Sequence, residues 1–146
     1  MSGDQHERLD GGCACGRISL QAKFTGPMTA LQPRACDCPY CRRHGAAYLS
    51  DPNGRLVVRL ADAADAHWER QGDELAEFLC CAGCAMLVAV VYRDAGGAHA
   101  AINARVLREY ERLPPAVAVS PRLLAAADKV ARWRQLWFGD VRIGAD

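Results

Sequence analysis

The sequence predicts a mainly β protein built from antiparallel sheets, with one amphipathic helix near the C-terminus. Residues 18–24 alternate strictly between apolar and polar side chains, which is the pattern of a half-buried strand. Short β-rich segments follow, separated by turn signals such as the Asp-Pro-Asn-Gly sequence at residues 51–54. Between residues 123 and 137, apolar side chains instead recur every three or four positions, which is the period of a helix.

The other strands are placed by their composition and by the turns between them. One strand leads into Cys36, and a hairpin with arms at residues 75–81 and 86–92 carries a C-x-x-C motif between its arms. Further strands are expected at residues 46–50, 55–60, around Trp68, 99–104 and 140–143. The helix is expected at about residues 121–138, with Ser120 as N-cap, Pro121 at the first helical position and Gly139 as its stop.

The length and the net charge of the chain limit the number of domains and the kinds of partner that we expect. A chain of 146 residues fits one domain, so we expect a flexible tail at residues 1–10 and a single domain at residues 11–146. The formal net charge of +1 argues against nucleic acid or a membrane surface as partner. The sequence has no apolar run of transmembrane length and no apolar signal core near residue 1. Clustered cysteines without an export signal favour a cytoplasmic metal-binding or redox protein.

Seven of the eight cysteines fall into short motifs: C-x-C at residues 13–15, C-x-C-x-x-C at residues 36–41 and C-x-x-C at residues 81–84. Alternate residues of an extended chain share a face, so a C-x-C motif directs two thiolates toward one point. Sulfur-only ligand sets favour zinc or iron–sulfur clusters over hard cations, and these spacings lack the usual iron–sulfur pattern. We therefore expect Zn²⁺ at two sites.

The first site is expected to be a closed structural site. Cys13, Cys15, Cys81 and Cys84 supply the four ligands that structural zinc usually takes, and they would tie the N-terminal turn to the central hairpin. Cys80 is expected to be a buried core thiol, because adjacent residues of a strand point to opposite faces. The alternative is that the four cysteines are only core thiols, which their paired short spacings disfavour.

The second site is expected to keep one position free. Cys36, Cys38 and Cys41 supply three thiolates, which leaves room for a water or a substrate thiol. Arg42 and Arg43 follow directly and are candidates for binding the carboxylates of an acidic substrate, although such pairs are commonly just a solvated face. The alternative is that His44 completes a structural site of three cysteines and one histidine.

Taken together, the three clusters resemble the glutathione-dependent formaldehyde-activating enzyme (GFA) family, to which centromere protein V is related. The resemblance rests on GCACG at residues 12–16, CDCPYCRRHGA at residues 36–46 and FLCCAGC at residues 78–84, within a match from about residue 11 to residue 105. It implies a β-tent fold, carbon–sulfur lyase chemistry and two zinc ions, with the glutathione thiol at the three-cysteine site. The family usually has glycine directly after the last cysteine, where this chain has Ala85.

The resemblance and the residues together favour an enzyme that adds a thiol such as glutathione to a small aldehyde and gives an S-hydroxymethyl adduct. One alternative is a non-catalytic, zinc-stapled binding module, which requires a filled fourth position at the three-cysteine site. Another is a thiol redox protein, which requires disulfides and no tightly held metal. Trp68, Trp133 and Trp137 are expected in the core rather than at a substrate site.

Overall fold

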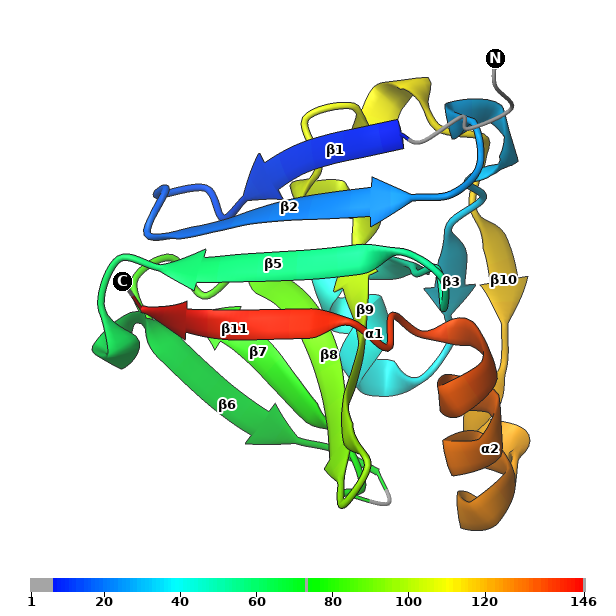
Figure 1. Cartoon of the computed structure of the whole chain (residues 1–146). Helices are drawn as coiled ribbons and strands as arrows, with labels where there is room; N and C mark the ends of the chain where they lie inside the picture. The colour runs from blue at the N-terminus through cyan, green and yellow to red at the C-terminus, as the bar shows by residue number, and fades with distance from the viewer. Residues whose placement is uncertain (1–6, 73, 146) are drawn as a thin grey trace.

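The computed structural model describes residues 7–72 and 74–145 and confirms a mainly β fold (Figure 1). Its strands form two sheets, of which the smaller has the order β1-β2-β5-β11. These strands are β1 (Glu7–Gly12), β2 (Ile18–Phe24), β5 (Arg55–Leu60) and β11 (Val141–Ala145). The first and last described strands therefore belong to the same sheet.

The larger sheet has seven strands in the order β10-β3-β4-β9-β8-β7-β6. Most neighbours pair antiparallel, as predicted, but β10 pairs parallel with β3 and β11 pairs parallel with β5 in the other sheet. The strands of the larger sheet are β3 (Arg34–Cys36), β4 (Ala47–Leu49), β6 (Ala66–Arg70), β7 (Glu77–Cys81), β8 (Leu87–Asp94), β9 (Gly97–Asn103) and β10 (Val117–Val119).

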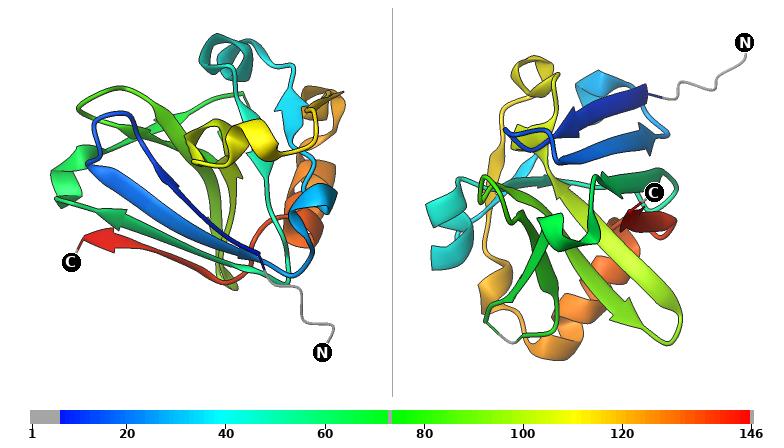
Figure 2. Two further views of the ribbon diagram at one scale, coloured as in Figure 1. Left: turned by 90° about the horizontal axis from the view of Figure 1, so that it is seen from above. Right: turned by 90° about the vertical axis from the view of Figure 1, so that its left-hand side faces the viewer.

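Two α-helices accompany the sheets. Helix α1 (Pro39–His44) follows shortly after β3, and α2 (Ala126–Leu136) contacts β9 and lies at the lower right of Figure 1, below β3 and β10, with two further views in Figure 2. In the described ranges no helix is long and apolar enough to cross a membrane. Short 3-10 turns occur at Met28–Ala30, Ala63–Asp65, Ala104–Val106, Tyr110–Arg112 and Pro121–Leu123.

The larger sheet has a buried cluster on each of its faces. The apolar faces of β2 and β5 pack against β7, β8 and β9 to form the main core between the sheets. A smaller core on the opposite face includes side chains of α1 and the C-terminal end of α2. Strand β7 contributes side chains to both cores, because successive side chains of a strand point to opposite faces. Leu79 and Cys81 belong to the main core, while Phe78 and Cys80 belong to the smaller one.

The predicted N-terminal tail is too long. Residues 7–10 belong to β1, which pairs along its whole length with β2 and buries Leu9. This segment is polar apart from Leu9 and ends in two glycines, so it has no apolar alternation that would have indicated a strand. The remaining part of the predicted tail, residues 1–6, lies outside the described residues.

The predicted C-terminal helix at residues 121–138 is shorter in the structure. Pro121 opens only a 3-10 turn, after which the backbone is extended at Leu124 and α2 begins at Ala126. The helix ends at Leu136 because Phe138 is fully buried and exchanges two backbone hydrogen bonds with Ala100 of β9, at 2.8 and 3.1 Å. Packing of Phe138 into the main core therefore outweighs the helical periodicity of this segment.

Gly11 is a position where the fold requires the absence of a side chain. A Cβ atom there would lie 2.2 Å from the carbonyl oxygen of Val106, so the backbone would have to move. We predict that Gly11→Ala lowers the free energy of unfolding by about 1–3 kcal/mol, measured by urea denaturation. Gly144→Ala in β11 is the control, because no heavy atom lies within 4 Å of its added Cβ. Equal stability of the two variants would contradict this packing.

Candidate metal centres and the adjoining cavity

Four cysteines from two distant segments converge beside the main core. Cys13 and Cys15 lie in the turn between β1 and β2, whereas Cys81 ends β7 and Cys84 lies in the turn to β8. Their sulfur atoms all lie within 4.8 Å of one another. The Sγ–Sγ distances are 3.6 Å between Cys13 and Cys15 and 3.5 Å between Cys15 and Cys81. We call these four residues the quartet.

The quartet fits a tetrahedral zinc ion. Zn–S bonds of about 2.3 Å give sulfur–sulfur edges of about 3.8 Å, close to the observed separations. Backbone N–H groups of Ile18 and Gly83 donate to the sulfurs of Cys13 and Cys81, each at 3.3 Å, and such donors favour a thiolate over a thiol. Burial opposes ionisation of Cys84, but backbone N–H donors of Met86 and Cys15 lower its pKa to about 6.

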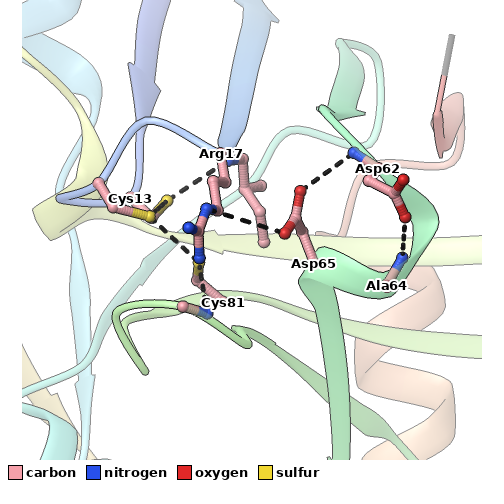
Figure 3. A network of polar contacts seen from close by, with 9 residues as sticks. Cys13, Arg17, Asp62, Ala64, Asp65 and Cys81 are labelled. Atoms are coloured by element: carbon pink, nitrogen blue, oxygen red, sulfur yellow. Dashed lines mark hydrogen bonds and ion pairs between the residues drawn. The ribbon is translucent and has the colours of Figure 1, made fainter.

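A cation lies next to the quartet (Figure 3). The Arg17 side chain lies between the cysteines and Asp65, whose carboxylate is 4.0 Å from its Nε. A Cβ on Gly83 would lie 2.1 Å from Arg17 Nη1, so the guanidinium packs directly on the C-x-x-C turn. Four thiolates around one divalent ion carry excess negative charge, which this arginine would offset.

The turn after the last cysteine holds a residue in left-handed backbone conformation. Ala85 has φ of +65°, and its N–H donates to the carbonyl of Cys81 at 2.8 Å. This is the position where the family resemblance predicts glycine. The chain therefore keeps the turn geometry with alanine, at a conformational cost of about 1–2 kcal/mol.

The other three clustered cysteines meet at the junction of β3 and α1. Cys36 ends β3, Cys38 is the N-cap of α1, and Cys41 lies in its first turn. The Cys38 sulfur accepts the backbone N–H of Cys41 at 3.3 Å, so it acts as the capping group of the helix. All three sulfurs lie within 4.8 Å of one another. We call these residues the trio.

The thiols of the trio are not equivalent. Hydrogen bonding from the Cys41 thiol lowers the pKa of Cys36 to about 6, while the same contact and burial raise the pKa of Cys41. The hydroxyl of Tyr48, on β4, lies 3.1 Å from the Cys41 sulfur, and burial raises the pKa of this tyrosine. Tyr48 therefore stays protonated and can donate a hydrogen bond to a thiolate at Cys41.

The end of β10 and the residues that follow it form hydrogen bonds with Asp37, in the loop of the trio. The Asp37 carboxylate accepts from Ser120 Oγ at 2.6 Å and from Arg122 Nε at 3.2 Å. Its backbone N–H donates to the carbonyl of Val119 at 3.1 Å. These contacts fix the residue between Cys36 and Cys38, and they lower the pKa of the Asp37 carboxyl through the Ser120 hydroxyl and the Arg122 charge.

No fourth ligand joins the trio among residues 7–72 and 74–145. The ring of His44 packs on Tyr40, with centroids 4.6 Å apart, and is not part of the sulfur group. Cys80 is buried on the same side of the sheet but contacts the Tyr40 hydroxyl at 3.4 Å and Glu69 at 3.6 Å. Burial raises the pKa of Cys80, as expected for the core thiol predicted here.

The trio lies in the wall of a cavity of about 700 Å³. Aromatic and apolar side chains from α1, β4, β7 and α2 supply much of its lining, among them Tyr40, Tyr48, Phe78, Trp133 and Trp137. The rings of Trp133 and Trp137 stack with centroids 4.8 Å apart. The prediction that these two tryptophans belong only to the core is incomplete, because they pack in the smaller core and also line the cavity.

The charged side chains that line the cavity are all cationic within the described part of the chain. They are Arg34, Arg43, Arg122, Lys129 and Arg132. Of the two arginines singled out in the sequence, Arg43 lines the cavity, with its guanidinium 5.8 Å from the Tyr40 ring centroid, whereas Arg42 does not. Burial and then the charge of Arg132 lower the pKa of Arg34, and both side chains line the cavity.

The group of four cysteines and the group of three cysteines beside the cavity are each arranged so that they could hold a metal ion. Residues 8–120 match the family described as glutathione-dependent formaldehyde-activating enzyme, and the chain belongs to this family. No curated protein sequence matches the chain. The crystal structure of a Rhodobacter sphaeroides protein is similar in fold, with a TM-score of 0.54 and 19% identity over 92% of this chain and 98% of that one.

The left-handed backbone at Ala85 leads to a test. We predict that Ala85→Gly raises the free energy of unfolding by about 0.5–1 kcal/mol, because relief of the strain exceeds the extra chain entropy of glycine. Ala82→Gly in the same turn, where φ is not positive, should instead destabilise by a similar amount. Denaturant unfolding of both zinc-loaded variants checks this pair, and loss of stability in both would refute it.

Proposed function

We propose that this protein is a zinc-dependent carbon–sulfur lyase that adds a thiol such as glutathione to a small aldehyde such as formaldehyde. Membership of the GFA family supports this reaction class. The observation that carries the proposal is the position of the trio, which lacks a fourth ligand in the described chain and borders a cavity lined by cations. The sulfur of a thiol substrate has a place to bind at the trio. The cationic side chains of the cavity are complementary to the carboxylates of such a substrate.

The two sulfur groups have different roles in this proposal. The quartet holds a structural zinc that ties the turn between β1 and β2 to the turn between β7 and β8. Zinc at the trio, when bound, supplies a Lewis-acid position that stabilises a substrate thiol as thiolate. Tyr48 holds the Cys41 sulfur by its hydroxyl, at 3.1 Å, and fixes the orientation of that ligand.

The remaining groups bind and enclose the substrate. Arg43 attracts a carboxylate of the thiol substrate, and the stacked rings of Trp133 and Trp137 exclude water from one wall of the cavity. In the reaction the thiol loses its S–H proton, its sulfur forms a bond to the aldehyde carbon as the carbonyl π bond opens, and the carbonyl oxygen takes up one proton, so that S–H adds across C=O. The product is an S-hydroxymethyl adduct, and the reverse reaction releases the thiol and the aldehyde.

The two alternatives have less support. A non-catalytic binding module stapled by zinc would need a filled fourth position at the trio, and His44, the predicted candidate, packs on Tyr40 instead. A thiol redox protein would use disulfides, whereas the structure has eight free cysteines. Zinc analysis of protein purified without chelator distinguishes the redox protein from the other two.

The separate roles of the two groups predict different effects of losing one sulfur. Wild-type protein should contain about two zinc ions per chain by plasma mass spectrometry. Cys84→Ser should lose the structural ion and unfold, since structural zinc contributes roughly 10 kcal/mol or more to small domains. Cys38→Ser should keep about one zinc ion and the circular dichroism of the folded protein. Unfolding of both variants, or of neither, would contradict the assignment.

The proposed activity is tested with glutathione and ¹³C-formaldehyde, following adduct formation by NMR. Zinc-loaded protein should accelerate formation above the spontaneous rate, and Cys38→Ser should return the rate to the spontaneous value because the trio is broken. Cys80→Ser is the matched control, because this cysteine belongs to neither group, and it should keep the acceleration. Absence of acceleration by wild-type protein with two bound zinc ions would exclude this reaction.

A further inference from the structure

Arg17 connects the two halves of the quartet. It follows Cys15 by two residues in the turn between β1 and β2, and its backbone N–H donates a hydrogen bond to the Cys15 sulfur. Its side chain reaches the other half of the quartet, where it packs against Gly83, between Cys81 and Cys84. One side chain therefore spans the same two segments that a metal ion at the quartet would join.

The guanidinium occupies a space that is open because residue 83 has no side chain. The three atoms nearest to a Cβ added at Gly83 all belong to Arg17, namely Nη1 at 2.1 Å, Cζ at 3.1 Å and Cδ at 3.3 Å. The φ angle of Gly83 is not positive, so its backbone conformation is also open to alanine. Alanine at this position would therefore displace the guanidinium and leave the four cysteines unchanged.

Asp65 holds the Arg17 side chain on the side away from the cysteines (Figure 3). Its Oδ1 lies 4.0 Å from Arg17 Nε. Its Oδ2 accepts the backbone N–H of Asp62 at 3.0 Å, and its carbonyl accepts the backbone N–H of Ala82 at 2.8 Å. Asp65 is thus fixed to the C-x-x-C turn itself, and the fold sets the position of the guanidinium relative to the quartet.

The ion pair with Asp65 does not by itself explain this arrangement. The Arg17 side chain is 56% exposed, and an exposed pair at 4.0 Å contributes little to stability. The quartet offers a larger charge, because four thiolates around one divalent ion have a net charge of about −2. Cys13 and Cys81 are buried, so solvent screens this charge incompletely. A fixed guanidinium beside the sulfurs favours their deprotonated, metal-binding form.

We propose that Arg17 raises the zinc affinity of the quartet without binding the ion, and that Gly83 is required because it admits the guanidinium. Arg17 is in this sense a positioning residue, which acts through the charge and hydrogen bonds that it presents to the ligands. The inference goes beyond the proposed function, because it concerns the structural site and holds whether or not the trio is catalytic.

The test measures zinc binding at the quartet. Each variant is made in a Cys38→Ser background, which breaks the trio, and is equilibrated with a neutral chelator that sets the concentration of free zinc. An anionic chelator is avoided, because arginine would attract it. Arg17→Gln should lower the zinc affinity about 10- to 100-fold. Arg17→Lys should lose less, because it keeps the positive charge but lacks the planar fork. Bound zinc is counted by plasma mass spectrometry, and circular dichroism verifies the fold.

Arg8→Gln is the matched control for the loss of one exposed arginine. The Arg8 side chain is 54% exposed, and its Nε lies 3.4 Å from an Asp10 carboxylate oxygen. Arg8 pairs with Lys23 at the end of the β1–β2 hairpin that is remote from the cysteines. Arg8→Gln should therefore leave the zinc affinity unchanged. Equal zinc affinities of Arg17→Gln and Arg8→Gln would overturn the inference.

Gly83→Ala is a second test, which keeps every charge and every cysteine. It should lower the zinc affinity by about the same factor as Arg17→Gln, because the added Cβ takes the place of the guanidinium. The double variant should bind zinc as tightly as either single variant, because no guanidinium is left to displace. Full affinity in Gly83→Ala, or additive losses in the double variant, would overturn the role of Gly83.

These outcomes are independent of the proposed reaction. Every measurement is made without aldehyde or thiol substrate, so a failure of the proposed lyase activity leaves the result for Arg17 unaffected. If Arg17→Gln does not fold, Gly83→Ala still decides the question, because it removes the guanidinium from the quartet while Arg17 stays in the chain.

Discussion

Convergence of the quartet sulfurs is the constraint on which the rest of the structure depends. Cys13 and Cys15 lie in the turn between β1 and β2 of the small sheet, whereas Cys81 and Cys84 lie at the end of β7 and in the turn that follows it in the large sheet. Sulfurs separated by 3.5–3.6 Å repel each other as thiolates unless a cation lies between them. A metal ion bound at this point would fix the two sheets against each other beside the main core.

The large sheet connects the quartet to the candidate site, because its strand β7 has side chains on both faces. Its strand β7 places Cys81 in the main core at the quartet and Cys80 in the smaller core behind Tyr40. The smaller core in turn contains Cys41 of the trio, Tyr48, which contacts the Cys41 sulfur, and Trp137, the C-cap of α2. The cavity thus lies on the face of the sheet opposite the quartet, and its walls come from segments far apart in the sequence.

Local sequence patterns predicted the parts of the fold and site that depend on local geometry. The short cysteine spacings bring together the sulfurs within each motif, and strict alternation identified β2. Both β1 and β10 are edge strands that were missed, β1 because it has almost no apolar residues and β10 because it is only three residues long. The cavity cations Arg34 and Arg132 were missed because only tertiary packing brings β3 and α2 together. For the same reason the sequence could not show that Arg43 lines the cavity and Arg42 does not.

The measurement that tests the central claim most directly is zinc K-edge X-ray absorption of the fully loaded protein. A closed quartet and an open trio predict an average of about 3.5 sulfur ligands per zinc, with the remainder supplied by a light atom. Added glutathione should raise this average toward about four sulfurs per zinc. An average of four sulfurs without added thiol, or imidazole scattering from a histidine ligand, would contradict the account.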